Sequence, residues 1–315
     1  MSNYGKVVAF AGGVGGAKLA TGLHSILEDG TLSVVVNTAD DFTLHGLHIS
    51  PDVDTVMYNL AGLSDPKQGW GIKGDTNEAL KILDIYGGAS WFKLGDKDIA
   101  THIRRTQRLN EGKNLTEVTS ELSSALGIKT TILPMTNNEV ATRIITPEGE
   151  LEFQDYFVAR KTLPKVIGVN FHGIENASAT KEVLSAIEEA SHIIFCPSNP
   201  IVSIGPILEV SEIREKLLNP HCTRVAVSPI IGGKALRGPA AEMLKSLNYE
   251  MSAVGVAKFL REFIDGFVMD TVDKQLKNQI EKIGLKIKTL PTIMSNLQTK
   301  RNLARQTLEF SDSLK

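Results

Sequence analysis

Four aspartates and two histidines lie within residues 37–56, NTADDFTLHGLHISPDVDTV. Asp40 and Asp41 follow an apolar stretch that is typical of a buried strand, and Asp54 follows Ser50-Pro51, a pattern typical of a helix start. A loop that folds back would bring Asp40, Asp41 and Asp54 together, and their charges would repel. Because Mg²⁺ binds carboxylates together with substrate phosphates, we predict that these three aspartates bind Mg²⁺. One of them could instead accept a proton in catalysis.

Three other side chains of the segment have alternative interpretations. Asp52 would lie in the first turn of the expected helix, where a carboxylate stabilises the helix dipole without binding a ligand. His45 and His48 have a spacing that zinc sites use, but no thiolate accompanies them, which disfavours zinc.

The stretch GGVGGAK, residues 12–18, follows one apolar run and begins another with helical spacing. Backbone N–H groups at such a helix start favour an anion. The spacing before Lys18 is too short for a Walker loop, and Lys18 stands where a dinucleotide fingerprint has its third glycine. We expect a phosphate-bearing ligand here, and a tight turn without a ligand is the alternative. The candidate residues are Gly12, Gly13, Gly15, Gly16 and Lys18.

Two later loops, residues 196–206 and 228–240, each follow an apolar run and are rich in Ser, Gly and Pro. Both should leave the sheet at the same edge as the glycine loop and contact a nucleotide base and its phosphates. The candidates are Ser198, Asn199, Ser228, Gly232 and Gly233. The segment 91–105 adds Lys93, and its Arg104 and Arg105 cannot both face one site because they are adjacent on a helix.

The elements that would position these residues alternate strand and helix. Residues 6–13, 14–27 and 32–40 read as a βαβ unit, and strands that are apolar throughout indicate a sheet buried on both faces. Further strands are expected at 129–135, 165–173, 192–200 and 223–233, and helices at 179–190, 204–218, 239–247 and 299–315. We predict a Rossmann-like α/β fold with a doubly wound, mostly parallel sheet in one domain, 1–315. It carries a helical insertion at 75–126 and a β-hairpin insertion at 141–160.

Composition excludes several classes of protein. The formal net charge is −2 and no Lys/Arg block is present, which argues against nucleic-acid binding. No apolar run is long enough to span a bilayer, and no signal-peptide pattern is found. Two cysteines are too few for a disulfide framework, so we expect a cytoplasmic protein without a membrane or nucleic-acid partner.

The ordered set of motifs resembles the 2-phospho-L-lactate transferase family of coenzyme F420 biosynthesis, including its bacterial phosphoenolpyruvate transferase relatives. The matching stretches run from about residue 7 to 270: GGVGGAKLATGL, VVVNTADDFTLHGLHISPDVDTVMY, WGIKGDT, WFKLGDKDIATHIRR, FCPSNPIVSIGPI and VAVSPIIGGKALRGPAAEM.

The resemblance implies that a guanylylated donor, such as lactyl-2-diphospho-5′-guanosine or its enolpyruvyl counterpart, reacts with the ribityl hydroxyl of the deazaflavin Fo. The products would be F420-0, or dehydro-F420-0, and GMP, with Mg²⁺ assisting. It also implies a homodimer, assigns Asp54 and Lys93 to the deazaflavin site, and assigns the loops of Ser198–Asn199 and Ser228–Gly233 to GDP.

Two other functions are weighed against this one. A nucleotide-sugar-binding regulator of the gluconeogenesis-factor type would share the fold, and an NAD-dependent oxidoreductase would explain the glycines alone. The sequence leaves open whether the donor acid is lactate, enolpyruvate or glycerate, because a methyl group changes binding by only ~1–3 kcal/mol. Family naming alone favours the lactyl donor slightly.

Overall fold

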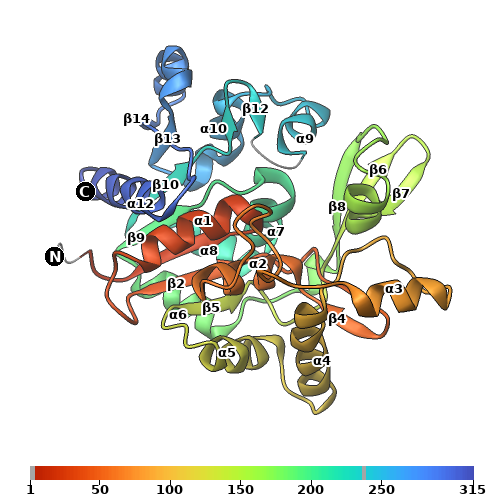
Figure 1. Ribbon diagram of the computed structural model, residues 1–315. Coiled ribbons are helices and arrows are strands. Elements are labelled where there is room, and N and C mark those ends of the chain that lie inside the picture. The colour runs from red at the N-terminus through yellow and green to blue at the C-terminus, as the bar shows by residue number, and fades with distance from the viewer. Residues whose placement is uncertain (1–3, 236–238) are drawn as a thin grey trace.

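A sheet of seven parallel strands organises the fold. The computed structural model describes residues 4–235 and 239–315. The strands are β1 (Val7–Ala11), β2 (Leu32–Val36), β5 (Thr131–Pro134), β9 (His192–Phe195), β10 (Thr223–Val227), β13 (Gly266–Asp270) and β14 (Lys286–Leu290). Their order is β14-β13-β10-β9-β1-β2-β5, and every neighbouring pair is parallel. Figure 1 shows this arrangement.

The chain direction across the sheet reverses between β1 and β9. From β1 the chain adds β2 and then β5 on one side, and it returns to add β9, β10, β13 and β14 on the other. This is the Rossmann-like topology that the sequence predicts. Ligands of such sheets bind at the carboxyl ends of the strands beside this switch point, where the loops after β1 and β9 meet.

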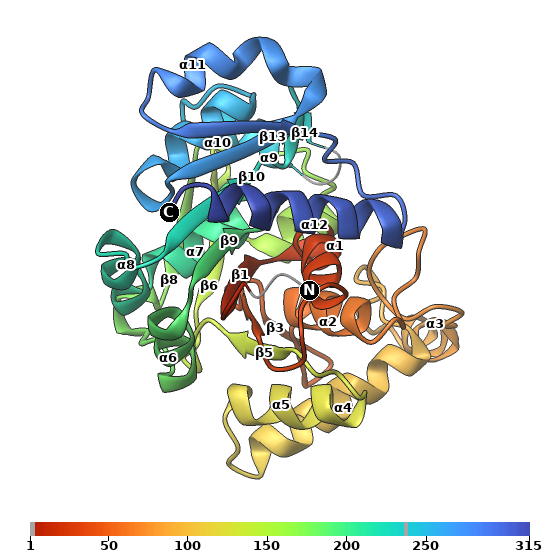
Figure 2. The same cartoon turned by 90° about the vertical axis from the view of Figure 1, so that its left-hand side faces the viewer.

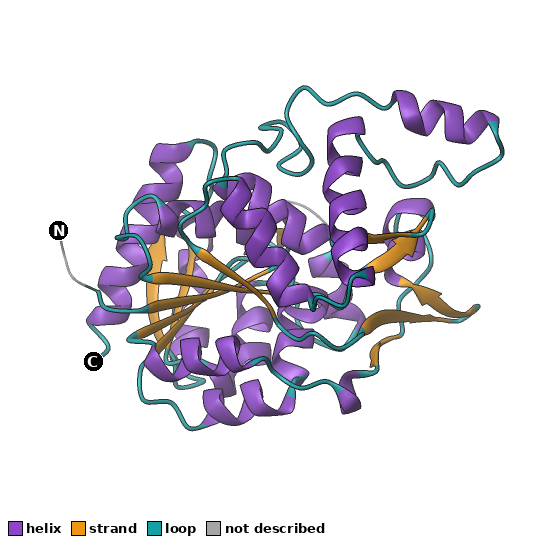
Figure 3. Cartoon of the chain, turned by 90° about the horizontal axis from the view of Figure 1, so that it is seen from below, coloured by secondary structure: helices purple, strands orange, loops and turns teal. Residues whose placement is uncertain are grey.

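Helices cover both faces of the sheet (Figure 3) because side chains of each central strand alternate between two apolar cores. Val7, Ala9 and Ala11 face a core with α1 (Gly13–His24), α2 (Pro51–Leu60) and α12 (Leu297–Asp312). Val8 and Phe10 face the other core. That second layer contains α6 (Lys181–Glu189), α7 (Gly205–Glu209), α8 (Ser211–Leu218), α9 (Ala240–Ser246), α10 (Ala253–Leu260) and α11 (Lys277–Glu281). Figure 2 shows α12 alongside α1.

The predicted helical insertion contains α3 (Glu78–Ile85), α4 (Asp96–Asn110) and α5 (Leu115–Ala125). Two aspartates of the family motifs cap these helices reciprocally. Asp75 accepts hydrogen bonds from the backbone N–H groups of Lys97 and Asp98 at the start of α4. Asp96 accepts from the N–H groups of Glu78 and Ala79 at the start of α3. These aspartates therefore fix α3 against α4.

The predicted hairpin at 141–160 is β6 (Ala141–Thr146) and β7 (Gly149–Glu152), followed by a π-helical turn at Asp155–Ala159. The strand expected at 165–173 exists as β8 (Gly168–His172), but it pairs antiparallel with β6 in a separate three-stranded sheet. The prediction that it belongs to the parallel series was therefore wrong. Its burial is intermediate or low throughout, so its apolar composition did not indicate the central sheet.

Several smaller elements lie outside the sequence prediction. The hairpin of β3 (Phe42–Leu44) and β4 (Leu47–Ile49) interrupts the acidic segment. A second hairpin joins β11 (Ile230–Ile231) to β12 (Lys234–Ala235), and short helical turns occupy Ile174–Asn176, Pro200–Ile204, Arg261–Phe263 and Thr271–Leu276. Within residues 4–235 and 239–315, no helix is long and apolar enough to cross a membrane.

Candidate functional site

The acidic segment lies where β2 ends and α2 begins, beside the glycine loop that joins β1 to α1. Ser50 occupies the N-cap position of α2, but its hydroxyl donates to Asp41 Oδ2 (2.7 Å) instead of capping the helix. Asp52 and Asp54 both lie in the first turn, and both side chains are buried. The first turn of α2 therefore directs two carboxylates into the protein.

The start of α1 is occupied by side chains of the protein itself. Gly13 N–H donates to Asp52 Oδ1 (2.7 Å), and Gly12 N–H donates to Ser198 Oγ (3.0 Å). A Cβ at Gly15 would lie 2.1 Å from the backbone oxygen of Pro197. These glycines bring the loop after β1 against the loop after β9, which is a structural reason for their presence. The role of Gly12, Gly13, Gly15 and Gly16 in phosphate binding stays a prediction.

Helix α1 packs against α12, and the charge of Lys18 acts on Lys300 of α12: burial is the larger cause that lowers the pKa of Lys300, and Lys18 lowers it further. Gly16 packs so closely that a Cβ there would lie 2.5 Å from Ser198 Oγ.

Asp40 and Asp52 form an electrostatically strained pair. Burial raises the pKa of Asp40 well above its usual value, and repulsion from Asp52 raises it further. Burial also raises the pKa of Asp52 to about 6, although hydrogen bonds from Asn37 and Gly13 oppose the shift. Asp40 Oδ1 has no hydrogen-bond partner among the described residues. A cation at this point would stabilise both carboxylates.

Asp41 is held by the hairpin that follows it. His48 Nε2 lies 3.1 Å from Asp41 Oδ2, which also accepts the Ser50 hydroxyl. Burial raises the pKa of Asp41 in spite of these contacts. Asp41 Oδ1 is likewise without a partner in the part of the chain that the structure describes.

Asp54 is paired with an arginine that is fully buried. Arg105 of α4 donates from both terminal nitrogens to the two Asp54 oxygens, with Nη1 3.1 Å from Oδ2. Burial opposes the charge of Arg105, but the charge and hydrogen bonds of Asp54 outweigh it and hold the arginine pKa above its usual value. Arg104 is exposed and donates to Gln107, so the two arginines do face different ways.

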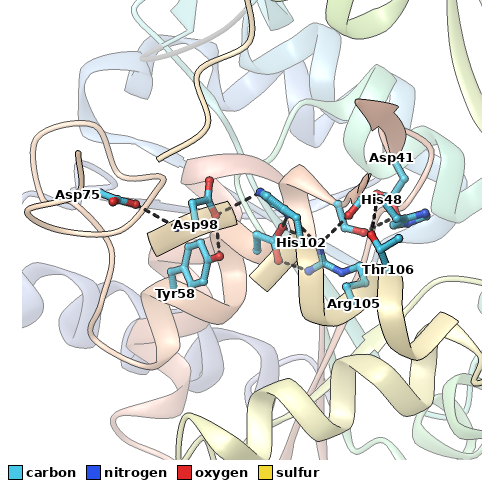
Figure 4. Close-up of polar contacts among 10 residues, drawn as sticks. Asp41, His48, Tyr58, Asp75, Asp98, His102, Arg105 and Thr106 are labelled. Carbon is cyan, nitrogen blue, oxygen red and sulfur yellow. Dashed lines mark hydrogen bonds and ion pairs between the residues drawn. The ribbon is translucent and has the colours of Figure 1, made fainter. Parts of the chain in front are cut away.

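The network continues along α4 to Tyr58 of α2 (Figure 4). Arg105 Nη1 lies 3.3 Å from His102 Nδ1. Arginine only donates, so this contact requires an accepting Nδ1; the other ring nitrogen, Nε2, lies 3.4 Å from Asp98 Oδ1. Tyr58 donates to the same Asp98 oxygen (2.6 Å). Burial raises the pKa of Asp98, but the contacts with His102 and Tyr58 outweigh it and leave that pKa below its usual value.

Three potential metal ligands, Asp54, Asp98 and His102, have atoms within 4.8 Å of one another. Asp40 and Asp41 do not belong to this group. The arginine that occupies both Asp54 oxygens supplies the positive charge there. The predicted set of Asp40, Asp41 and Asp54 is thus divided: Asp54 faces Arg105, and Asp52 is the carboxylate beside Asp40. Binding of a metal by any of them is untested and stays a prediction.

The two later loops do reach the carboxyl edge of the sheet. Asn199 Oδ1 accepts from the N–H groups of Ile201 and Val202, and Ser228 Oγ contacts the backbone of Ile230. Gly232 donates to Asp273, and Gly232 and Gly233 have φ of +58° and +74° in the turn between β11 and β12. Residues 236–238 of the second loop lie outside the described residues. Whether these loops bind a nucleotide stays a prediction.

Lys93 is exposed on the loop before α4. Its neighbours in sequence form an aromatic cluster with the residue that follows Asp41. The ring of Phe42 is stacked on Trp91 (6.2 Å between centroids) and lies edge-on to Phe92 (4.9 Å). His45 contacts the carbonyl oxygen of Ala89 instead of joining His48.

Sequence reasoning missed the partners of the predicted carboxylates. Asp98, His102 and Arg105 occur at helical spacing in the motif WFKLGDKDIATHIRR, so one face of α4 bearing all three was a detectable signal. No comparable sequence pattern marked Asn37 or Asp273, because each of them contacts residues of another loop at the carboxyl edge of the sheet.

The profile of the family described as 2-phospho-L-lactate transferase CofD matches residues 7–299. The 2-phospho-L-lactate transferase of Methanosarcina mazei is 41% identical over 298 residues, which cover 95% of this chain and 98% of that protein. The phosphoenolpyruvate transferase of Streptomyces griseus is 37% identical over 316 residues, covering 98% and 99% respectively.

A crystal structure of the protein BH3568 from Bacillus halodurans superposes with a TM-score of 0.63 at 16% identity, covering 96% of this chain and 99% of that one. A second structure of that protein, described as a member of the UPF0052 family, gives the same TM-score. At this identity the likeness concerns the fold alone.

Proposed function

The chain belongs to the 2-phospho-L-lactate transferase family CofD, and we propose that it transfers a phospholactyl or enolpyruvyl-phosphoryl group from a guanosine diphosphate ester to the deazaflavin Fo. We assign the reaction to this edge of the sheet because a group of buried carboxylates lies at the end of β2, next to the switch point. Such a group suits phosphoryl transfer, which depends on positioning and charge neutralisation.

In the proposed reaction, the terminal ribityl hydroxyl of Fo attacks the phosphorus that bears the acid. A new P–O bond forms, the P–O bond to the guanosine monophosphate moiety breaks, and GMP leaves with that electron pair. The hydroxyl proton passes to a carboxylate or to solvent. Asp54 is the proposed acceptor-side carboxylate, since Arg105 fixes both of its oxygens and leaves lone pairs for the incoming hydroxyl.

Mg²⁺ fits Asp40 and Asp41 better than Asp54. Both Asp40 and Asp41 carry a buried oxygen without a partner among the described residues, and burial raises the pKa of both. A bound Mg²⁺ would supply charge neutralisation for the diphosphate. These two aspartates would hold it, and Asp52 beside them adds negative charge.

Lys93 and the aromatic cluster of Phe42, Trp91 and Phe92 are the proposed contacts for the deazaflavin. Aromatic rings next to a cationic side chain suit a planar fused heterocycle with polar edges. GDP would then bind on the side of the loops after β9 and β10. We also propose that the enzyme acts as a homodimer.

The donor acid is lactate or enolpyruvate, with lactate preferred. Relatives that carry each name are similar to this chain. The test offers Fo together with the lactyl, enolpyruvyl and glyceryl guanosine diphosphate esters in competition and reads the product masses. A dominant glyceryl product would contradict the donor class.

A nucleotide-sugar-binding regulator is not favoured by the family to which the chain belongs. The two functions separate in a thermal shift experiment, because a ligand that binds only the folded state raises Tm. We expect GDP to raise Tm and UDP-sugars to leave it unchanged.

A further inference from the structure

One face of α4 carries three polar side chains into the interior. Asp98, His102 and Arg105 follow one another at intervals of four and three residues, so they align along the helix. Arg105 is 0% exposed and is among the largest fully buried side chains of the protein. Its guanidinium group donates to Asp54 of α2.

The same turn of α4 also holds the backbone of His48. Arg105 Nη1 lies 3.4 Å from the carbonyl oxygen of His48, and the N–H group of His48 donates to Thr106 Oγ1 (2.8 Å). The ring of His48 in turn contacts Asp41 (3.1 Å). Neighbouring residues of α4 therefore fix Asp54 directly and Asp41 through one intermediate.

Stability alone does not account for this arrangement. A buried ion pair costs desolvation of both charges, and apolar side chains of similar volume often hold two helices equally well. Arg105 is also suited to orientation in a way that lysine is not. Its planar group bonds both carboxylate oxygens at once and so fixes the rotation of the Asp54 side chain.

We infer that Arg105 is a positioning residue for the transfer reaction: from the helical insertion, it orients Asp54 towards the acceptor and braces the hairpin that carries His48 and Asp41. The inference rests on the proposed function of Asp54. It assigns the helical insertion a role in catalysis, because α4 connects Asp54 to Asp41 through His48.

A double-mutant cycle tests whether Arg105 acts through Asp54. The variants are Arg105→Met, Asp54→Asn and the two combined, and kcat/KM for Fo is measured with saturating lactyl guanosine diphosphate ester and Mg²⁺. We expect Asp54→Asn to lose about 100-fold or more and Arg105→Met at least about 10-fold. The combined variant should match Asp54→Asn within about threefold. The positioning residue, Arg105, no longer affects kcat/KM once the carboxylate that it positions is gone.

Two further variants separate positioning from folding. Arg105→Lys keeps the buried charge but lacks the two-pronged geometry, so it should fold and recover only part of the lost kcat/KM. Arg104→Met, the matched control, removes an exposed arginine and should keep kcat/KM within about twofold. Calorimetric titration with GDP should give the same affinity, within about twofold, for all of these proteins.

A combined variant whose loss of kcat/KM equals the product of the two single losses, and so exceeds that of Asp54→Asn by about 10-fold or more, would overturn the inference. So would full activity of Arg105→Met, or a loss of GDP affinity as large as the loss of kcat/KM. If Arg105→Met does not fold, Arg105→Lys decides: wild-type kcat/KM in that variant contradicts the positioning role. A wild-type protein without transfer activity would instead refute the proposed function, and the inference with it.

Discussion

Replacing Arg105 by methionine is expected to destabilise the protein because it leaves a buried carboxylate without its partner. Asp54 is 5% exposed, and Asp98 adds a second negative charge within the same network. Removing one partner of a buried ion pair costs about 3–5 kcal/mol. The entropy of unfolding is about 2.1 cal/mol/K per residue, so 315 residues give about 0.66 kcal/mol/K and Tm should fall by about 5–8 °C.

Urea denaturation followed by circular dichroism measures this loss, with the midpoint as the readout. The combined variant Asp54→Asn/Arg105→Met removes both charges and should recover most of the lost free energy of unfolding. Arg104→Met, which removes an exposed side chain that donates to Gln107, should stay within about 0.5 kcal/mol of wild type. If Arg105→Met and Arg104→Met unfold at the same midpoint, the Asp54–Arg105 pair does not have the burial and geometry described here.

Three further changes have distinct expected outcomes. Asp52→Asn should flatten the fall in stability between about pH 4 and 6: burial raises the pKa of Asp52 to about 6 from 3.8, so its ionisation costs the folded state about 3 kcal/mol as pH rises through that window. Urea midpoints at pH 4 and 7 test this, and equal slopes for variant and wild type would contradict it. Gly15→Ala should destabilise by about 1–3 kcal/mol, because its Cβ would lie 2.1 Å from the Pro197 carbonyl oxygen; a denaturation midpoint unchanged from wild type would refute that contact. Lys93→Ala should weaken binding of Fo and leave that of GDP intact in calorimetric titrations, and the opposite result would place Lys93 on the nucleotide side.

The central fold was predictable because buried parallel strands have a strong local signature. The run that became β1 is apolar at every position, those that became β2, β9 and β10 are mostly apolar, and the glycines after β1 marked the first βα turn. The strands β13 and β14 were both missed: β13 is buried at every position, whereas β14 is an edge strand with the sequence Lys-Ile-Lys-Thr-Leu. The strand β8 was assigned to the wrong sheet because pairing partners are set by tertiary contacts that its own residues do not encode.

The candidate site was predictable as a location and less so as a set of contacts. The aspartates of residues 37–56 do lie at the carboxyl edge of the sheet, as their place after a strand indicated. Their grouping was not predictable from spacing. Asp52 and Asp54 are two residues apart on a helix, so they point about 200° apart, one towards Gly13 and one towards Arg105. Which of them faces Asp40 depends on how α2 docks.

The proposed transfer requires cleavage of the P–O bond between the acid-bearing phosphorus and GMP, which the products of a single reaction reveal. Wild-type protein is incubated with Fo, the lactyl guanosine diphosphate ester and Mg²⁺, and the products are separated and identified by mass. We expect a deazaflavin phosphodiester and GMP in equal amounts, with no turnover in excess chelator. Release of GDP in place of GMP, or no deazaflavin product from the lactyl or the enolpyruvyl ester, would contradict it.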